Sequence, residues 1–167
     1  APILAGSASA QLGLFDPPAK APSAQSVKSL EALIGQRLSL KGNTLPAPLR
    51  QQLQQSLDQL KQKLAFYDLS QPAVRQEVHG LLKQLAQQLS MANLMEPPIK
   101  TELDQLSASV IAESGAHLGL QVERRGNLPG LKVAHAPQPG QETLLTESQE
   151  LLRDLERAKH SPKKFDP

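Results

Sequence analysis

Cysteine and tryptophan are absent from this chain, and aromatic side chains of any kind make up only 2% of its 167 residues. The absence of cysteine excludes a disulfide framework, a thiolate nucleophile and cysteine-ligated zinc or iron–sulfur sites. Because aromatic rings help to line small-molecule pockets and stack on nucleic-acid bases, their scarcity disfavours both kinds of binding. No apolar run approaches the about 20 residues that a helix needs to cross a bilayer.

A strong excess of one charge is also missing. Eighteen basic and sixteen acidic residues leave a net charge of +2, which is far from the basic excess typical of nucleic-acid-binding domains. The chain is rich instead in leucine and glutamine, with 30 and 19 residues respectively. Since β-branched and aromatic residues are sparse, this composition favours helices over strands.

Leucine-rich stripes at helical spacing predict a mainly α protein, an up-and-down bundle of four to five helices. The segments Ser70-Gln71-Pro72 and Glu96-Pro97-Pro98 each end one helix and start the next, the first with a cap and an early-turn proline, so the connections are short and neighbouring helices are antiparallel. The predicted apolar faces are Val27, Leu30, Ile34 and Leu38; Leu53, Leu57, Leu60, Leu64 and Tyr67; Val74, Val78, Leu81, Leu85, Leu89 and Ala92; Ile99, Leu103, Leu106, Val110 and Ile111; and Leu144, Leu145, Leu151, Leu152 and Leu155.

Capping signals set the expected helix ends. Ser26 is a suitable N-cap for the first helix, and Gly115 or Gly119 would end the fourth. The last helix is expected to start near Thr143 or Thr146, the second of which opens a capping-box pattern.

Residues 118–140 interrupt the helical pattern. Apolar and polar residues alternate in 120–124 and again in 131–135, and the turn-forming residues 125–130 lie between them. This arrangement predicts a short β-hairpin or an irregular loop. Because an isolated hairpin is marginally stable in water, it should lean on the bundle or bind a partner.

The domain organisation follows from these patterns. We expect a flexible arm rich in Pro, Ala and Ser over 1–25, a bundle domain over 26–160 with the hairpin or loop inserted at about 118–140, and a flexible tail over 161–167. The chain begins with Ala1, which fits either a processed protein or a domain cut from a longer one. The composition resembles that of bacterial exported or secretion-associated proteins, and it leaves the bacterial cytoplasm and export both open.

The sequence lacks the spacing patterns of catalytic sites, and we therefore expect a protein that is not an enzyme. The histidines His79, His117, His135 and His160 lack the His-Glu-x-x-His spacing of a helix-borne zinc site. His79 lies beside an apolar face and is expected at the edge of the core or on the surface. Ser114-Gly115 lacks the Gly-x-Ser-x-Gly elbow and is expected to end a helix. We therefore assign no catalytic, cofactor-binding or metal-binding residue.

One short segment has a likeness to a known family. Gly42-Asn43 followed by Pro48-Leu49-Arg50 resembles the arginine-finger motif of bacterial GTPase-activating effector domains, which are also small and helical. The resemblance implies that Arg50 would reach the phosphates of a bound nucleotide in a GTPase. The chain departs from the family because Ala47 stands in place of a glycine, and the second motif requires a tryptophan that this chain lacks.

The function that the sequence favours is a non-enzymatic protein–protein interaction module, a helical adaptor or scaffold whose partner is another protein. We expect no small-molecule substrate. The candidate contact patch consists of Arg124, Arg125 and Leu128, because a leucine on the predicted six-residue loop 125–130 has little core to fill.

Two alternatives remain open at this point. A membrane surface or a nucleic acid could bind a small basic hairpin tip formed by Arg124, Arg125 and Lys132. The segment 161–164 resembles the basic turns of DNA minor-groove tails, but a single copy on a chain of net charge +2 disfavours nucleic acid. The second and less favoured alternative is an effector that acts on a GTPase through Arg50.

Overall fold

The computed structural model describes residues 22–41, 45–125, 128–136, 139 and 142–160. The predicted mainly α bundle with a short hairpin is confirmed. The predicted arm and tail lie outside the described residues, apart from residues 22–25, which are helical. In chain order, the elements are α1 (Pro22–Lys41), α2 (Ala47–Phe66), α3 (Pro72–Met91), α4 (Pro97–Ser114), the 3-10 turn η2 (Ala116–Leu118), β3 (Gln121–Arg125), β4 (Leu128–Lys132) and α5 (Glu142–His160).

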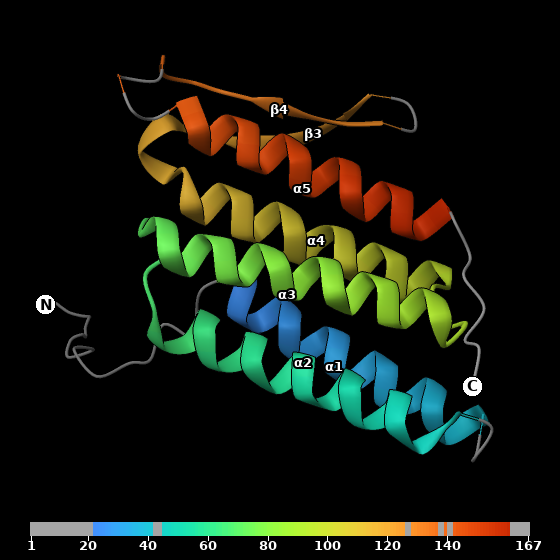
Figure 1. Ribbon diagram of the computed structural model, residues 1–167. Coiled ribbons are helices and arrows are strands. Elements are labelled where there is room, and N and C mark those ends of the chain that lie inside the picture. Colours follow the sequence, from blue (N-terminus) through green and yellow to red (C-terminus); the bar gives the residue numbers. More distant parts are fainter. Residues whose placement is uncertain (1–21, 42–44, 126–127, 137–138, 140–141, 161–167) are drawn as a thin grey trace, which may run out of the picture.

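The helices form three layers in which successive helices run in opposite directions (Figure 1). Helices α1 and α2 form the lower layer of this view, α3 and α4 the middle one, and α5 with the hairpin the upper one. Helix α1 packs on α4 and α2 on α3, while α5 packs on α3, β3 on α4 and β4 on α5. The middle layer is thus covered on both faces, and no further described element lies on the outer face of α1 and α2.

The core is aliphatic, as the leucine stripes predict, and no aromatic side chain is buried in the described part of the chain. One predicted core position is wrong. Tyr67 lies just beyond the end of α2 and is exposed. On α3 the predicted Leu81 packs against the core while partly buried, and Leu82, which was not predicted, is fully buried because the 3.6-residue helical period carries the stripe from Val78 to Leu82.

Prolines rather than side-chain caps start the three central helices. Each of α2, α3 and α4 has a proline at its first or second position and no side-chain cap, so the cap expected at Ser70-Gln71 is wrong. Helix α5 begins at Glu142, which places Thr146 inside the helix rather than at its start.

Helix α1 begins at Pro22, four residues before the N-cap expected at Ser26. The cause is a tertiary contact with α4. The backbone N–H and the hydroxyl of Ser23 donate to the carboxylate of Glu113, at 2.8 and 2.5 Å. Ala24 in the same turn is buried. A pattern that marks only local caps does not reveal such an anchor.

The turn from α3 to α4 depends on Asn93, a stop signal that the sequence reasoning missed. Asn93 adopts the left-handed conformation with φ of 57°, which asparagine tolerates better than most residues. Its N–H donates to Ser90 O at 3.1 Å, and the N–H of Leu94 donates to Leu89 O at 2.9 Å. This is the Schellman pattern, and it buries Leu94 against the core.

The hairpin is joined to the end of α4 through backbone contacts. Helix α4 ends at Gly115, one of the two predicted positions. The carbonyl of Leu118 accepts the N–H groups of Ala134 and His135, both at 3.0 Å. Gly119, which directly follows Leu118, has φ of 63°. This left-handed conformation favours glycine.

The strands lie closer to the hairpin tip than the sequence predicts. The antiparallel register pairs Gln121 with Lys132 and Arg125 with Leu128. The predicted loop 125–130 is therefore wrong, because the second strand already begins at Leu128. Backbone pairing between the two strands overrides the local preference for a turn, even though Pro129 and a glycine lie within the second strand.

Candidate functional site

The predicted contact patch lies at the tip of the hairpin. The backbone register places Arg125 opposite Leu128 and Arg124 opposite Pro129, whereas the side chains of Arg124, Arg125 and Leu128 are outside the described set. Leu128 is a strand residue and not part of a loop. Lys132 pairs with Gln121 at the base of the hairpin, about 13 Å along the strands from the tip. The expected basic tip therefore does not include Lys132.

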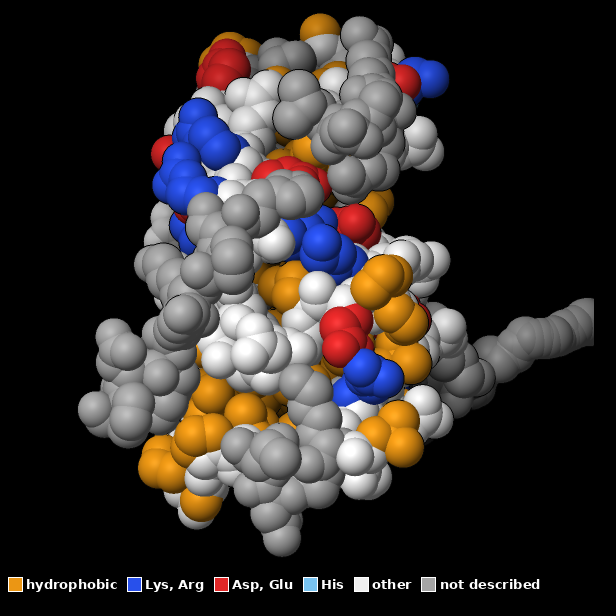
Figure 2. Space-filling view, turned by 90° about the vertical axis from the view of Figure 1, so that its right-hand side faces the viewer, with side chains coloured by type: hydrophobic (Ala, Val, Ile, Leu, Met, Phe, Trp, Pro, Cys, Tyr) orange, Lys and Arg blue, Asp and Glu red, His pale blue; other side chains and the backbone are white. Residues whose placement is uncertain are grey.

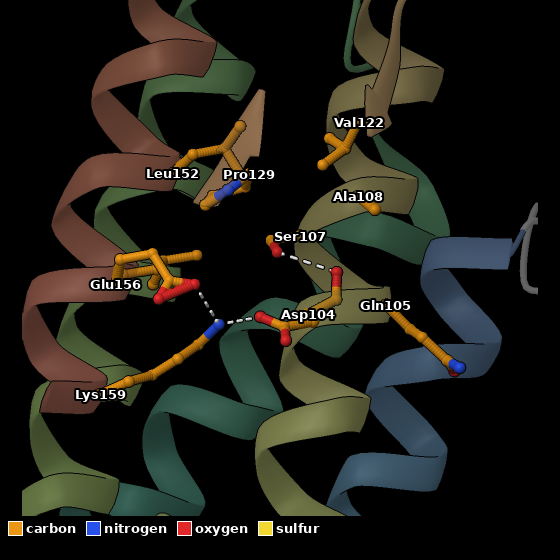
Figure 3. A pocket seen from close by; sticks show the side chains of 10 residues that line it. Asp104, Gln105, Ser107, Ala108, Val122, Pro129, Leu152, Glu156 and Lys159 are labelled. Atoms are coloured by element: carbon orange, nitrogen blue, oxygen red, sulfur yellow. Dashed lines mark hydrogen bonds and ion pairs between the residues drawn. The ribbon is translucent and has the colours of Figure 1, made fainter. Parts of the chain in front are cut away.

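Beneath the hairpin lies a small pocket between α4 and α5 (Figure 3). Its volume is about 200 Å³. Ser107 and Ala108 have short side chains, and they leave this space unfilled on α4. Apolar side chains from the hairpin and from α5 close it: Val122, Pro129, Leu152 and Leu155.

The polar end of this pocket is an ion-pair cluster centred on Lys159. The Lys159 side chain is only 6% exposed and pairs with Asp104 of α4 and, at 3.4 Å, with Glu156 of its own helix. Burial, together with repulsion from Lys100, lowers the pKa of Lys159 to about 8. The amine is still protonated at neutral pH, so it serves as the cation of the cluster rather than as a nucleophile.

A row of basic residue types on α3 faces α5. Arg75, His79 and Lys83 follow one another at intervals of four residues, which places them on one side of the helix. Arg75 Nε donates to Glu147 Oε1 at 2.8 Å, and Lys83 Nζ pairs with Asp154 Oδ2 at 3.3 Å. We call Arg75, His79 and Lys83 the α3 row.

His79 occupies the centre of the α3 row and is buried. Burial is the main cause that lowers its pKa to about 4; Glu147 acts in the opposite direction, and Arg75 and Lys83 also contribute to the lowering. The ring is thus neutral at pH 7. Its Nε2 atom and the hydroxyl oxygen of Ser148 on α5 are both buried without a hydrogen-bond partner. Such orphaned polar atoms are costly in a protein interior.

A groove of about 660 Å³ separates α1 from α2 on the outer face of the bundle. Ala24 and Val27 of α1 contribute buried apolar side chains to it, and Ala65 and Phe66 contribute the apolar side chains of α2. We call it the α1–α2 groove. Its polar lining consists of Lys28, Gln55, Asp58, Gln59, Lys61 and Gln62.

Both aromatic residues in the described part of the chain are exposed at the C-terminal end of α2, and the first of them, Phe66, lines this groove. Phe66 is 72% exposed and Tyr67 is 53% exposed. Lys63 Nζ lies 4.5 Å from the centre of the Tyr67 ring, a cation–π contact. Aromatic side chains are enriched in protein interfaces and in their energetic hot spots. The sequence reasoning missed Phe66 and assigned Tyr67 to the core.

The remaining sequence candidates carry no further site. Ser114 Oγ donates to Val110 O at 2.7 Å, as expected of a serine that ends a helix. His117 and His135 are exposed, and Arg50 is half-buried in α2. Within the described ranges, His, Asp and Glu side chains nowhere form a group of three that could hold a metal ion. None of the described helices is long and apolar enough to cross a bilayer.

Acidic and basic side chains are interspersed on the end of the molecule shown in Figure 2.

Comparison of the chain with protein families, curated proteins and solved structures gave no match.

Proposed function

We propose that this protein is a non-enzymatic protein-binding module that contacts its partner through the α1–α2 groove, with Phe66 as the anchor. The observation that supports this proposal is the placement of the aromatics. In a chain whose described core is wholly aliphatic, Phe66 lines the α1–α2 groove with 72% of its surface exposed, and the neighbouring Tyr67 is exposed as well.

The energetics favour burial of Phe66 by a partner. Moving a phenylalanine side chain from water into an apolar contact contributes about 1.5–3 kcal/mol, and Phe66 has 72% of its surface available for such burial. An exposed phenylalanine makes no such contribution to the isolated fold, and burial by a partner would supply it.

The shape of the groove suits an amphipathic helix from the partner. Two neighbouring helices leave a channel into which a third helix places anchors at i, i+3 or i+4 and i+7. The charges of the rim largely cancel within the chain, because Lys61 pairs with Glu31 at 2.9 Å and with Asp58 at 3.5 Å. Neutral glutamine side chains supply much of the remaining polar contact. The proposed partner helix is therefore apolar on one face and polar without a strong charge at its edges.

Two observations support a role without catalysis. The buried amine of Lys159 is held in ion pairs with two carboxylates, and His79 is buried beneath α5, away from solvent. The Lys159 amine is thus occupied by its ion pairs, and the His79 ring has no access to a substrate in this arrangement.

The test compares retention of a partner by three forms of the full chain. Phe66→Gln removes the proposed anchor, and Leu40→Gln is the matched control, because Leu40 is an equally exposed apolar residue, 76% exposed, at the C-terminal end of α1. The partner captured from a cell extract by the unmodified chain should be retained by Leu40→Gln and weakened about tenfold or more by Phe66→Gln, since about 1.4 kcal/mol corresponds to a factor of ten. Equal retention by Phe66→Gln and the unmodified chain would contradict the proposal.

A further inference from the structure

The contact between α3 and α5 differs from the other described helix contacts because a buried histidine lies inside it. Arg75 is only 7% exposed in its pair with Glu147, and His79 lies one turn further along α3. Lys83 and Asp154 form the next cross-helix pair. Ser148 of α5 is completely buried and has no hydrogen-bond partner.

We propose that the α3 row is an acid-sensitive attachment for α5, which releases α5 from the bundle when His79 becomes protonated while α1 and α2 stay folded on α3 and α4. This inference is independent of the proposed protein-binding function, because it concerns the opposite layer of the bundle (Figure 1).

Protonation of His79 should release α5 because the described part of the closed bundle offers the charged ring no free counter-charge and its Nε2–H no acceptor. Among the described residues, the charged groups that act on the ring are Glu147 of α5 and Arg75 and Lys83 of α3. Glu147 is already paired with Arg75. A histidinium would thus add a third positive charge to the α3 row, and its Nε2–H would lack an acceptor. Separation of α5 from α3 admits water to this charge.

The lower layer has no histidine in its helices α1 and α2 that could act in the same way. The buried polar contact between α2 and α3 is a neutral hydrogen bond, from Ser56 Oγ to Gln88 Oε1 at 3.0 Å. The ion pair between Lys61 and Glu31 is about 30% exposed, so water already reaches it. Histidine is the side chain that ordinarily changes charge between pH 7.5 and 5.0, whereas carboxylates change charge at lower pH. Mild acid therefore acts first on the attachment of α5.

The size of the effect follows from linkage. Burial lowers the pKa of His79 from 6.5 to about 4, and release of α5 restores the ordinary value. The released form then binds more protons than the closed form between these two pH values. The equilibrium constant for release should rise about thirtyfold between pH 7.5 and 5.0.

Hydrogen–deuterium exchange with mass spectrometry on the full chain measures this release directly. After correction for the intrinsic pH dependence of exchange, α5 amides should lose protection about thirtyfold from pH 7.5 to 5.0, and α1 and α2 amides should keep theirs. Unchanged protection of α5 would overturn the proposal. Simultaneous loss of protection in all five helices would also overturn it, because that result is global unfolding.

Two variants separate His79 from the other titrating groups. His79→Gln keeps a polar side chain that does not titrate, and His135→Gln makes the same change at an exposed histidine. The pH response of α5 should disappear in His79→Gln and persist in His135→Gln. A thirtyfold response that survives in His79→Gln would refute the assignment to His79. If His79→Gln folds poorly, the exchange profile of the unmodified chain still decides whether α5 is released.

Discussion

Gly119 provides a sharp test of how the hairpin is attached to the bundle. Its φ of 63° is in the left-handed region, and a Cβ added to it would lie 2.6 Å from Ala134 Cβ. Ala134 has little freedom to move away, because its N–H donates to Leu118 O at 3.0 Å. The change Gly119→Ala should therefore both strain the backbone and push the segment that follows β4, which contains Ala134, away from η2.

The expected cost combines two contributions. A left-handed conformation costs an alanine about 1–2 kcal/mol more than a glycine. Relief of the 2.6 Å contact requires the loss or lengthening of a backbone hydrogen bond, which contributes about another 1 kcal/mol. We expect Gly119→Ala to lower the free energy of unfolding by about 2–3 kcal/mol.

Gly80 supplies a matched control with the opposite sign. It lies in the interior of α3, and a Cβ added there meets no atom within 4 Å. Gly80→Ala should raise the free energy of unfolding by about 0.5–1 kcal/mol, because alanine loses less backbone entropy in a helix. Urea denaturation followed by circular dichroism measures both variants on one scale. A neutral or stabilising Gly119→Ala would refute the described attachment of the hairpin.

Two further predictions concern packing inside the bundle. Ala108→Leu should fill part of the 200 Å³ pocket beneath the hairpin and stabilise the fold by about 1 kcal/mol; a loss of stability in the same urea assay would show that the pocket is not empty. Gln88→Leu should destabilise by about 1–3 kcal/mol, because it leaves the buried hydroxyl of Ser56 without its partner. Adding Ser56→Ala to Gln88→Leu should recover much of this loss, and additive losses in the double variant would contradict the coupling of the two side chains.

The sequence predicts the helical architecture well because one physical signal dominates it. Leucine at spacings of three and four residues marks the buried face of α2, from Leu53 to Leu64, and short proline-rich connections imply antiparallel neighbours. The alternation near Val122 likewise indicates the hairpin. These features depend on local periodicity, which a sequence displays directly.

Features that depend on tertiary contact were not predictable in this way. The start of α1 depends on the bond between Ser23 and Glu113, 90 residues apart. The second strand extends back to Leu128 through pairing with Arg125 rather than through local preference.

The candidate surfaces show the same limit. The sequence placed Tyr67 in the core because it continues the heptad seam, but α2 ends one residue earlier. A usable signal did exist for the α3–α5 contact: Ser148 continues the spacing of Leu144, Leu151 and Leu155, which indicates a buried serine. The residues of α5 that pair with the buried side chains of α3 depend on how the layers pack, and a sequence pattern does not show this.

The most direct test of the proposed function places a photo-crosslinking amino acid at position 66. The same group at position 40 is the control, since Leu40 is equally exposed and lies at the end of α1, whereas Phe66 ends α2. If the α1–α2 groove binds a partner helix, irradiation in cells should join position 66 to one defined protein, with the crosslinked sites in that protein spaced three or four residues apart. Equal, diffuse crosslinking from positions 66 and 40 would contradict the assignment of the groove as a binding surface.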